Sequence, residues 1–322
     1  SVMKQSKQKW LFEQAVNRRA KKMNDQNIEV AKPSRPTSLE EMSKRQALQF
    51  NPEDLKKAAE FKLRPTDIVV TPYGKSGTTW IQQIVHTLRT RGDMDFDDIS
   101  RVAPWIEVSA GLGIDLDAPQ RAEPRAFKSH MDYDQIQKGG KYIISVRNPA
   151  DALVSAYHFM EGWYFEPGSI SIEEFALQRY VSSGGYWRHL KSWWPHRNDQ
   201  NVLFLAYEHM NKNPVQTIER VAEFCNIPLD EELKAITIEH SSLEFMKKHK
   251  NRFDDFIMRE RSERLCNLPP GSDSSKVRDG KVDSHKGNLN NKIMAALDEV
   301  WDKEIKQNLG FSNYADLLLE LT

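Results

Sequence analysis

The sequence predicts an α/β fold: one domain with a central, mostly parallel sheet and helices on both faces. Three observations support this prediction. Short β-branched runs alternate along the chain with segments whose apolar residues recur at helical spacing. One strand, at 67–71, leads through a glycine-rich turn into a helix, as in a P-loop-like strand–loop–helix. The length of 322 residues suits one large domain, expected over 63–322 after a helical N-terminal extension over 1–62.

Composition and charge exclude several classes of protein. The chain has 46 basic and 46 acidic residues, so its overall charge favours neither nucleic acid nor a membrane surface as a partner. Its two cysteines, Cys225 and Cys266, lie in no paired motif, which argues against a disulfide framework or a cysteine metal site. No apolar run approaches the roughly 18 residues of a membrane span, and the N-terminal lysines precede no apolar signal segment. We therefore expect a cytoplasmic protein with no membrane span.

The N-terminal part shows helix starts but no strands. Two prolines mark 31–37 as a linker. Ser38 followed by Glu41 forms a capping-box pattern, and Asn51-Pro52 combines an N-cap with a first-turn proline. Two short helices are therefore expected between the linker and about residue 61.

The stretch 67–89 carries the strongest local signal. Ile68–Val70 is a β-branched run, and the apolar residues that follow from Trp80 to Leu88 recur at helical spacing. Two glycines, a lysine and three hydroxyls lie between them. Such a turn presents backbone N–H groups at the positive end of a helix dipole, which favours an anion. The stretch predicts a phosphate- or sulfate-binding loop.

The rest of the chain repeats the alternation of strands and helices. Strands are expected at 125–128, 141–147 and 202–207. Helices are expected after Asn148-Pro149, after the cap at Ser171 and over 214–225, with a terminal helix from about Ile293 to Ile305. The charged, turn-rich segment 254–283 reads as a mobile flap, and 92–125 as irregular chain.

The anion loop alone leaves a nucleotide kinase possible. Gly74-Lys75-Ser76 matches the tail of G-x-x-x-x-G-K-[ST], but that motif requires a glycine where this chain has Val69. The sequence contains no G-x-G-x-x-G dinucleotide fingerprint.

Five motifs in order resemble those of the PAPS-dependent sulfotransferases, PAPS being 3′-phosphoadenosine 5′-phosphosulfate. The first is T-P-Y-G-K-S-G-T-T-W at 71–80. It is followed by F-K-S-H at 127–130, the segment V-R-N-P-A-D-A-L-V-S-A-Y-H-F at 146–159, L-A-Y-E-H-M at 205–210 and R-D-G at 278–280. The resemblance extends from about residue 64 to residue 288 and implies a sulfotransferase domain over 63–322.

The resemblance implies a donor site. Lys75 and the backbone of 76–79 would hold the 5′-phosphosulfate, and Trp80, Tyr207 and Leu243 would lie near the adenine. Arg147 and Ser155 would bind the 3′-phosphate, with Arg278 and Gly280 closing over it. The full implied set for PAPS, or its product PAP (adenosine 3′,5′-bisphosphate), is Lys75, Ser76, Gly77, Thr78, Thr79, Trp80, Arg147, Ser155, Tyr207, Ser241, Leu243, Arg278 and Gly280.

The implied reaction is in-line transfer of the sulfuryl group to a hydroxyl of a small-molecule or lipid-like acceptor. His130 would act as general base, because a neutral imidazole can take the hydroxyl proton. Lys75 and Lys128 would stabilise the charge that develops, and no metal is expected. Aromatic residues Trp105, Tyr133, Phe159 and Trp163 are candidates for the acceptor site.

Two departures from the family pattern qualify these expectations. Asp279 replaces the lysine of the family's R-K-G, and Ser284-His285-Lys286 replaces its D-W-K. The family's dimerisation pattern is not recognisable after Lys286, so a monomer is expected. A nucleotide kinase, and a PAP- or PAPS-binding protein without catalytic activity, are the alternatives.

Overall fold

The computed structural model describes residue 14 and residues 31–273 and 280–321 of the chain. By their contacts, residues form two compact units, Ser1–Ser34 and Arg35–Thr322. Most of the expected N-terminal extension before residue 31, and Arg278, which we expected to bind the 3′-phosphate, lie outside the described residues. The expected boundary at 62/63 remains a prediction, although the helices at Leu39–Ala47 (α2) and Pro52–Glu60 (α3) belong to the second unit.

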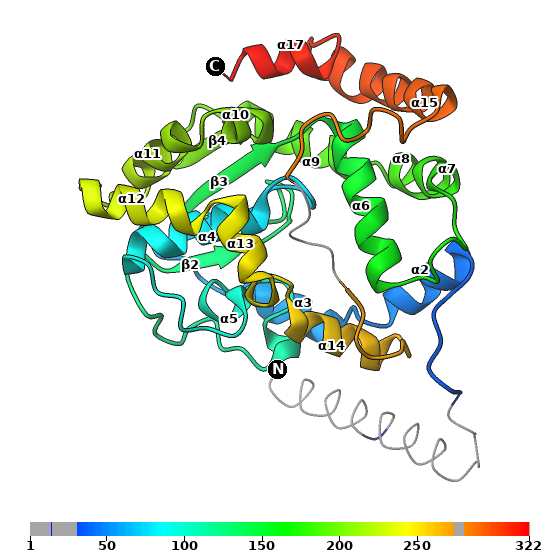
Figure 1. Ribbon diagram of the computed structural model, residues 1–322, viewed down its shortest axis with the longest axis horizontal. Coiled ribbons are helices and arrows are strands. Elements are labelled where there is room, and N and C mark those ends of the chain that lie inside the picture. Colours follow the sequence, from blue (N-terminus) through cyan, green and yellow to red (C-terminus); the bar gives the residue numbers. More distant parts are fainter. Residues whose placement is uncertain (1–13, 15–30, 274–279, 322) are drawn as a thin grey trace, which may run out of the picture. The chain divides into compact units, whose positions relative to one another are not determined.

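A sheet of parallel strands organises the second unit (Figure 1). The strands are β1 (Ile68–Val70), β2 (Ala126–Lys128), β3 (Lys141–Val146) and β4 (Val202–Ala206), in the order β2-β1-β3-β4. In β1, Val70 pairs with Lys128 of β2 and with Ile143 of β3. Because the strands are parallel, the segments that follow β1, β2 and β3 leave the same edge of the sheet. The parallel sheet was predicted and is confirmed.

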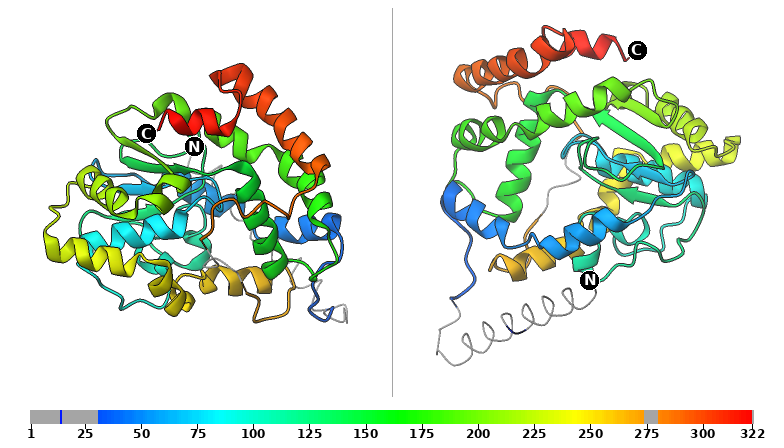
Figure 2. Two further views of the ribbon diagram at one scale, coloured as in Figure 1. Left: turned by 45° about the horizontal axis from the view of Figure 1, so that its top comes forward. Right: turned by 180° about the vertical axis from the view of Figure 1, so that it is seen from behind.

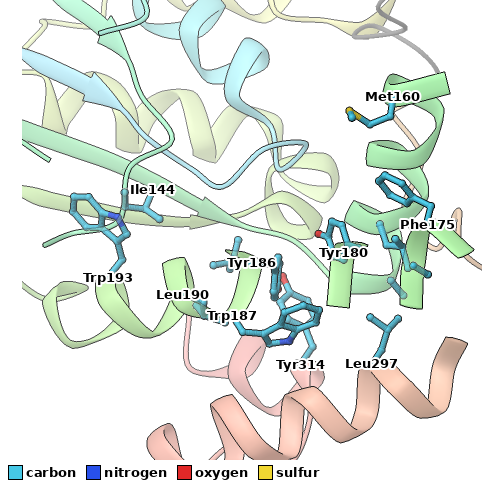
Figure 3. Close-up of a cluster of buried hydrophobic side chains, with 14 of the residues drawn as sticks. Ile144, Met160, Phe175, Tyr180, Tyr186, Trp187, Leu190, Trp193, Leu297 and Tyr314 are labelled. Atoms are coloured by element: carbon cyan, nitrogen blue, oxygen red, sulfur yellow. The ribbon is translucent and has the colours of Figure 1, made fainter. Parts of the chain in front are cut away.

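Each face of the sheet has its own apolar layer. Ile68 and Val70 face a cluster that contains Ile81 and Ile84 of α4 (Thr78–Thr90). Val69 faces the opposite cluster, which contains Leu153 of α6 (Pro149–Trp163). Strand residues that point alternately to two buried faces account for the continuous apolar runs in the sequence. Figure 3 shows part of the second layer, where Ile144 and the indole of Trp193 lie together.

Helix starts follow the capping residues that the sequence displays. The Ser38 hydroxyl accepts the Glu41 N–H at 3.2 Å, and the Asn51 side chain accepts the Glu53 N–H at 2.9 Å. The Asn148 side chain likewise accepts the Ala150 N–H at 2.9 Å, immediately before Pro149. Each bond satisfies one backbone donor that the first helical turn would otherwise leave unpaired.

The prediction of a turn-rich flap over 254–283 was wrong in its first part, because Phe256–Leu265 forms helix α14. This helix lacks an apolar stripe and is held by polar partners. Arg261 pairs with Asp54 of α3 at 3.3 Å, and the Ser262 hydroxyl donates to Gln49 at 2.7 Å. Figure 2 shows α3 and α14 side by side. Contacts between distant residues, invisible in local periodicity, therefore stabilise the helix.

The remaining elements complete the two layers. The expected strand at 202–207 ends at Ala206, and Tyr207 begins α10. No helix in the described part of the chain has the length and apolar character needed to cross a membrane. Helices and helical turns not yet given are α5 (Ile99–Val102), η1 (Ala110–Leu112), α7 (Ile172–Phe175), the π-turn η2 (Ala176–Tyr180), α8 (Val181–Ser183), α9 (Gly185–Trp193), η3 (Trp194–His196), α10 (Tyr207–Lys212), α11 (Pro214–Phe224), α12 (Glu231–His240), α13 (Leu243–Lys248), η4 (Lys250–Arg252), α15 (Asn291–Trp301), the π-turn η5 (Asp302–Lys306), α16 (Gln307–Leu309) and α17 (Tyr314–Leu319).

Candidate active site

The loop between β1 and α4 forms an anion cradle. Gly77, the residue before α4, has φ of 101°, and a Cβ added there would also contact the Tyr207 ring at 3.4 Å. The contact is an ordinary one, so it is the positive φ that favours glycine at this position. The loop is tied to β3, since Ser145 Oγ donates to the Ser76 carbonyl at 2.5 Å. Its N–H groups are thereby held at the start of a helix of 13 residues.

Two hydroxyls of this loop and one guanidinium nitrogen lack partners among the described residues. Ser76 Oγ, Thr78 Oγ1 and Arg147 Nε are all buried without a hydrogen bond. A buried polar atom without a partner is costly, typically by about 1–3 kcal/mol. A group with several acceptor oxygens at this position would satisfy such donors, so the cradle suits an oxyanion.

Arg147 connects the cradle to the segment after residue 279. Its Nη1 donates to the Lys75 carbonyl at 2.9 Å and its Nη2 to the Lys281 carbonyl at 3.2 Å. Its guanidinium carbon lies 4.1 Å from the Tyr207 ring centroid, and Tyr207 in turn contacts Trp80 edge-on at 5.9 Å. Arginine and the two aromatic rings therefore form one wall beside the loop.

Asp151, in the first turn of α6, anchors the segment that carries Gly280 and Lys281. Its carboxylate accepts the backbone N–H groups of Asp283 and His285, each at 2.9 Å, and lies 2.6 Å from His285 Nδ1. The ligating atoms of Asp151, Asp283 and His285 lie within 4.8 Å of one another. Because these contacts already satisfy Asp151, the cluster serves as an anchor for the segment.

His130 lies at the end of β2 with its imidazole oriented by the backbone. Its Nδ1 is 2.7 Å from the Pro72 carbonyl oxygen. A carbonyl oxygen can only accept, so Nδ1 carries the hydrogen, and in the neutral ring Nε2 is the acceptor. Trp105 packs edge-on against the ring at 5.4 Å. The tautomer is therefore the one that a proton acceptor at Nε2 requires.

Glu107 fixes both His130 and Trp105. One carboxylate oxygen accepts the His130 backbone N–H at 3.0 Å and the Trp105 indole N–H at 2.9 Å. Burial raises the pKa of Glu107 above its usual value. This residue lies in the irregular segment 92–125, where the sequence analysis assigned Trp105 but not Glu107 to the site.

Lys128 is held in a buried ion pair. Its Nζ lies 3.0 Å from a carboxylate oxygen of Asp255 and 4.1 Å from the Trp105 ring centroid. The other Asp255 oxygen accepts the Ser100 hydroxyl. Asp255 occupies the left-handed region at φ of 49°, immediately before α14. The ion pair sets the direction of the Lys128 ammonium within the cavity wall.

These groups share one cavity of about 1620 Å³. It runs from the β1–α4 loop and α13 to α2, α3 and α14, with α6 along its side. Its volume exceeds the roughly 300–1,000 Å³ of a single-ligand site, so it can accept two molecules together. Residues expected to bind donor or acceptor that line it are Lys75, Gly77, Thr78, Thr79, Trp80, Trp105, Lys128, His130, Arg147, Ser155, Phe159, Trp163, Tyr207, Ser241, Leu243 and Gly280.

Comparison with known proteins accounts for this arrangement. Residues 65–309 match the family described as Sulfotransferase domain. The chain belongs to the PAPS-dependent sulfotransferase family. It is 35% identical to Sulfotransferase 1B1 of Mus musculus over 206 residues, 59% of this chain and 68% of that protein. It is 31% identical to Sulfotransferase 2A1 of Homo sapiens over 213 residues, 62% of this chain and 74% of that protein. The sequence-based prediction of the family is confirmed, and the chain is a sulfotransferase enzyme.

Solved structures share the sulfotransferase fold. The crystal structure of mouse sulfotransferase SULT7A1 complexed with PAP has a TM-score of 0.64 at 23% identity, covering 85% of this chain and 95% of that one. That of retinol dehydratase in complex with androsterone and inactive cofactor PAP has a TM-score of 0.64 at 21% identity, covering 84% and 96%. These similarities support the predicted α/β architecture.

One expected acceptor residue of this sulfotransferase does not line the cavity. The Tyr133 ring stacks on His196 at 3.5 Å, and its backbone N–H donates to Ser192 at 3.0 Å. Lys138 covers the same ring at 4.2 Å. Ser76 does not line the cavity either. Its side chain is buried, and its hydroxyl has no partner among the described residues.

Sequence reasoning missed Asp255, Glu107 and Tyr73. Glu107 follows Trp105 by two residues in P-W-I-E, where a carboxylate beside an aromatic cavity candidate was a usable signal. The sequence contains no such signal for Asp255, because this residue lies in a charged segment far along the chain from Lys128. Tyr73 belongs to the recognised loop, and its ring lines the cavity against Tyr180 at 6.5 Å.

Proposed function

We propose that this sulfotransferase moves the sulfuryl group of PAPS to a hydroxyl of a small-molecule or lipid-like acceptor, with His130 as general base. The observation that carries the proposal is the His130 Nδ1 contact with the Pro72 carbonyl at 2.7 Å. It leaves Nε2 as the accepting nitrogen in the cavity that also contains Lys75. The reaction thus needs no rotation of the imidazole before a hydroxyl can be deprotonated.

The proposed step balances as follows. The acceptor oxygen attacks sulfur while His130 Nε2 takes the hydroxyl proton. The bond between sulfur and the bridging oxygen breaks, and its electron pair stays on the 5′-phosphate of the leaving PAP. Lys75 and Lys128 stabilise the charge on that oxygen and on the sulfuryl group. Such a base typically contributes about a hundred- to ten-thousandfold in rate.

The donor assignment rests on the unpartnered groups of the cradle. Thr78 and Arg147 line the cavity, and each has a buried polar atom without a partner in the described residues. We assign the β1–α4 loop to the 5′-phosphosulfate and Arg147 with Ser155 to the 3′-phosphate. We assign the backbone N–H of Gly280 to the same phosphate, and the Gly280 carbonyl is held by Asn211 at 2.5 Å. Arg278 remains a prediction outside the described residues.

The proposed acceptor site begins at His130. The rings of Phe159 and Trp163, one helical turn apart on α6, lie 4.7 Å apart at the cavity wall. Lys75 Nζ lies 4.9 Å from the Phe159 centroid, so this apolar wall adjoins the proposed point of transfer. Retinol dehydratase, which shares this fold, forms complexes with androsterone and with retinol, and this supports an apolar alcohol as acceptor.

The test compares His130→Ala with His196→Ala, a histidine outside this cavity that pairs with Asp199 at 2.8 Å. We expect His130→Ala to keep PAP affinity and to lose sulfuryl transfer to an alcohol panel by about a hundredfold or more. His196→Ala should retain transfer. Transfer by wild type should persist with a chelator, and ATP with magnesium should not substitute for PAPS. Full activity of His130→Ala would rule out His130 as the general base. Chelator-sensitive turnover with ATP would favour a kinase.

A further inference from the structure

In the wall of the cavity lies a guanidinium that has no acidic partner among the described residues. Arg179 is part of the π-turn η2 and lines the cavity. Its Nη1 donates to the Ser43 hydroxyl at 2.9 Å and its Nη2 donates to the Gln46 side-chain oxygen. Both acceptors are neutral. An arginine has five N–H donors, so donors remain beyond these two bonds.

The charges around the cavity show that Arg179 is an excess cation. The lysines and arginines of its lining are Lys75, Lys128, Arg147, Arg179, Arg261 and Lys281, and its carboxylates are Asp54 and Glu107. Arg261 is paired with Asp54, and Lys128 with Asp255. Lys75 and Arg147 belong to the proposed donor site, and the carbonyl of Lys281 accepts from Arg147. Within the described residues, Arg179 has no acidic partner, and it lies outside the proposed donor set.

No carboxylate is among the groups that favour the charged form of Arg179. Burial lowers the pKa of its guanidinium, and the nearby groups that favour its charged form are the phenols of Tyr73 and Tyr164. Burial raises the pKa of both phenols, so they are neutral near pH 7. A charged arginine that is partly buried and has no carboxylate partner is unfavourable. A ligand that supplies the negative charge would remove this cost.

A second unsatisfied group lies next to it in the same π-turn. Tyr180 is 7% exposed, lines the cavity, and its hydroxyl has no hydrogen-bond partner among the described residues. Figure 3 shows this hydroxyl turned away from Phe175. Single π-turns occur frequently at functional sites. Arg179 and Tyr180 therefore supply a charged and a neutral donor from adjacent positions.

We propose that Arg179 binds a carboxylate on the acceptor, so that the acceptor is an amphipathic hydroxy acid. This inference rests on the proposed sulfuryl transfer at the same cavity. The acceptor hydroxyl lies at His130, its apolar body contacts Phe159 and Trp163, and its carboxylate receives N–H donors from Arg179 with the Tyr180 hydroxyl beside it. A carboxylate suits a guanidinium because both are planar and can form two parallel hydrogen bonds.

The test uses hydroxy acids matched with their methyl esters. We would measure kcat/KM with PAPS for ω-hydroxy fatty acids from octanoic to hexadecanoic acid and for lithocholic acid, each beside its ester. Wild type should prefer at least one acid over its ester by roughly ten- to a hundredfold, the value of one charged hydrogen-bonded contact. Arg179→Gln should lower the rate with the acid to that with the ester and leave the ester unchanged. Arg179→Lys should retain part of the preference.

The control is Arg188→Gln, which removes an exposed arginine that pairs with Asp132 at 3.0 Å outside the cavity. It should keep the preference for the acid. Wild type that treats every acid and ester alike would overturn the inference, as would an Arg179→Gln variant with the preference intact. If no compound is sulfated, calorimetric binding of the acids to the PAP complex replaces turnover, and absence of Arg179-dependent binding overturns the inference.

Failure of the inference and failure of the proposed function are distinguishable. If neutral alcohols are sulfated and substitution of Arg179 has no effect, the proposed sulfuryl transfer is retained and the carboxylate-binding role of Arg179 is ruled out. A protein that binds PAP, shows Arg179-dependent binding of an acid and transfers no sulfuryl group to any alcohol removes the proposed reaction. In that case the carboxylate site is supported by binding alone.

Discussion

Asp255 and Lys128 come together from distant parts of the chain, with 3.0 Å between carboxylate and ammonium and each side chain only 2% exposed. Such a pair repays its desolvation only when the geometry is good and further bonds satisfy both ions. Here Ser100 donates to the second Asp255 oxygen, and the Trp105 ring lies 4.1 Å from the Lys128 ammonium. The pair positions a lysine for the proposed transfer.

Removing only the carboxylate should be destabilising and should impair transfer. Asp255→Asn keeps the shape but leaves the Lys128 charge buried without its partner, so we expect a loss of about 3–5 kcal/mol in the free energy of unfolding. We also expect a lower kcat, because the ammonium is no longer held in one direction. Urea denaturation and steady-state rates with PAPS measure the two effects.

Two further variants serve as controls: one breaks an exposed ion pair, and the other removes both charges of the buried pair. Asp97→Asn breaks the exposed Arg101–Asp97 pair, whose side chains are 51% and 54% exposed, and should cost less than about 1 kcal/mol. Lys128→Met combined with Asp255→Asn should recover most of the stability while transfer stays low, because asparagine tolerates the left-handed backbone and still offers Ser100 an acceptor oxygen. Equal stability of Asp255→Asn and wild type would show that the buried pair has no energetic role.

Acid should destabilise the fold through two buried histidines. Burial lowers the pKa of His86 and of His189 to about 4 in each case. Between the unfolded pKa of about 6.5 and the folded pKa, the unfolded chain binds more protons, so stability is present above pH 6.5 and is lost as pH falls towards 4. The shift corresponds to roughly 3 kcal/mol for each histidine.

This pH dependence can be assigned by replacing one of the two histidines. His189 Nε2 donates to the Thr71 carbonyl at 3.0 Å, and a glutamine amide can make the same bond without titrating. Urea unfolding between pH 7 and about pH 4.5 should show a shallower loss of stability for His189→Gln than for wild type. Identical slopes for the two proteins would contradict the assignment.

Much of the site could be predicted because parallel strands bring their following segments to one edge of the sheet. Lys75 after β1, His130 after β2 and Arg147 after β3 lie far apart in sequence, yet Lys75, His130 and Arg147 line one cavity. Short motifs at strand ends carry this information locally. Strand and helix starts were equally visible, since each depends on a few neighbouring residues.

The residues that sequence could not supply depend on long-range contacts. Asp255 meets Lys128 across 127 positions, and the helix that follows Asp255 is held by Gln49 and Asp54. Aromatic residues were ambiguous for a different reason. Trp163 and Tyr133 are both aromatic, but only Trp163 lines the cavity, because the Tyr133 ring is covered by His196 and Lys138.

A larger side chain at the proposed adenine site should strengthen donor binding. Leu243, the first residue of α13, is 41% exposed and lines the cavity beside Gly280. Leu243→Phe would add a ring that can stack on the base, and an aromatic pair is worth about 0.5–1.5 kcal/mol beyond its buried area. We expect the Kd for PAP to fall by about two- to tenfold, measured by calorimetry. Leu319→Phe, at a 70% exposed position, should leave it unchanged. An unaltered Kd in Leu243→Phe would place the base elsewhere.

One added methyl group at the start of α9 should disturb acceptor binding through Tyr73. A Cβ at Gly185 would lie 2.7 Å from the Tyr73 hydroxyl and 3.1 Å from its ring, so the tyrosine must move in Gly185→Ala. The Tyr73 ring lines the cavity and packs edge-on against Tyr180 at 6.5 Å and Tyr186 at 6.1 Å. Overpacking of this kind costs about 1–3 kcal/mol, and the displaced ring should raise KM for the acceptor.

The matched variants are Tyr73→Phe and the double variant with Gly185→Ala. Tyr73→Phe removes the closest atom but leaves the ring contact at 3.1 Å, so the double variant should recover part of the acceptor KM. PAP affinity should change little in all three proteins, because the loop bonds of Ser76 to Ser145 and of Lys75 to Arg147 do not involve the tyrosine side chain. An unchanged acceptor KM in Gly185→Ala would show that Tyr73 can move without cost. The Tyr73 side of the cavity would then not be the surface on which the acceptor rests.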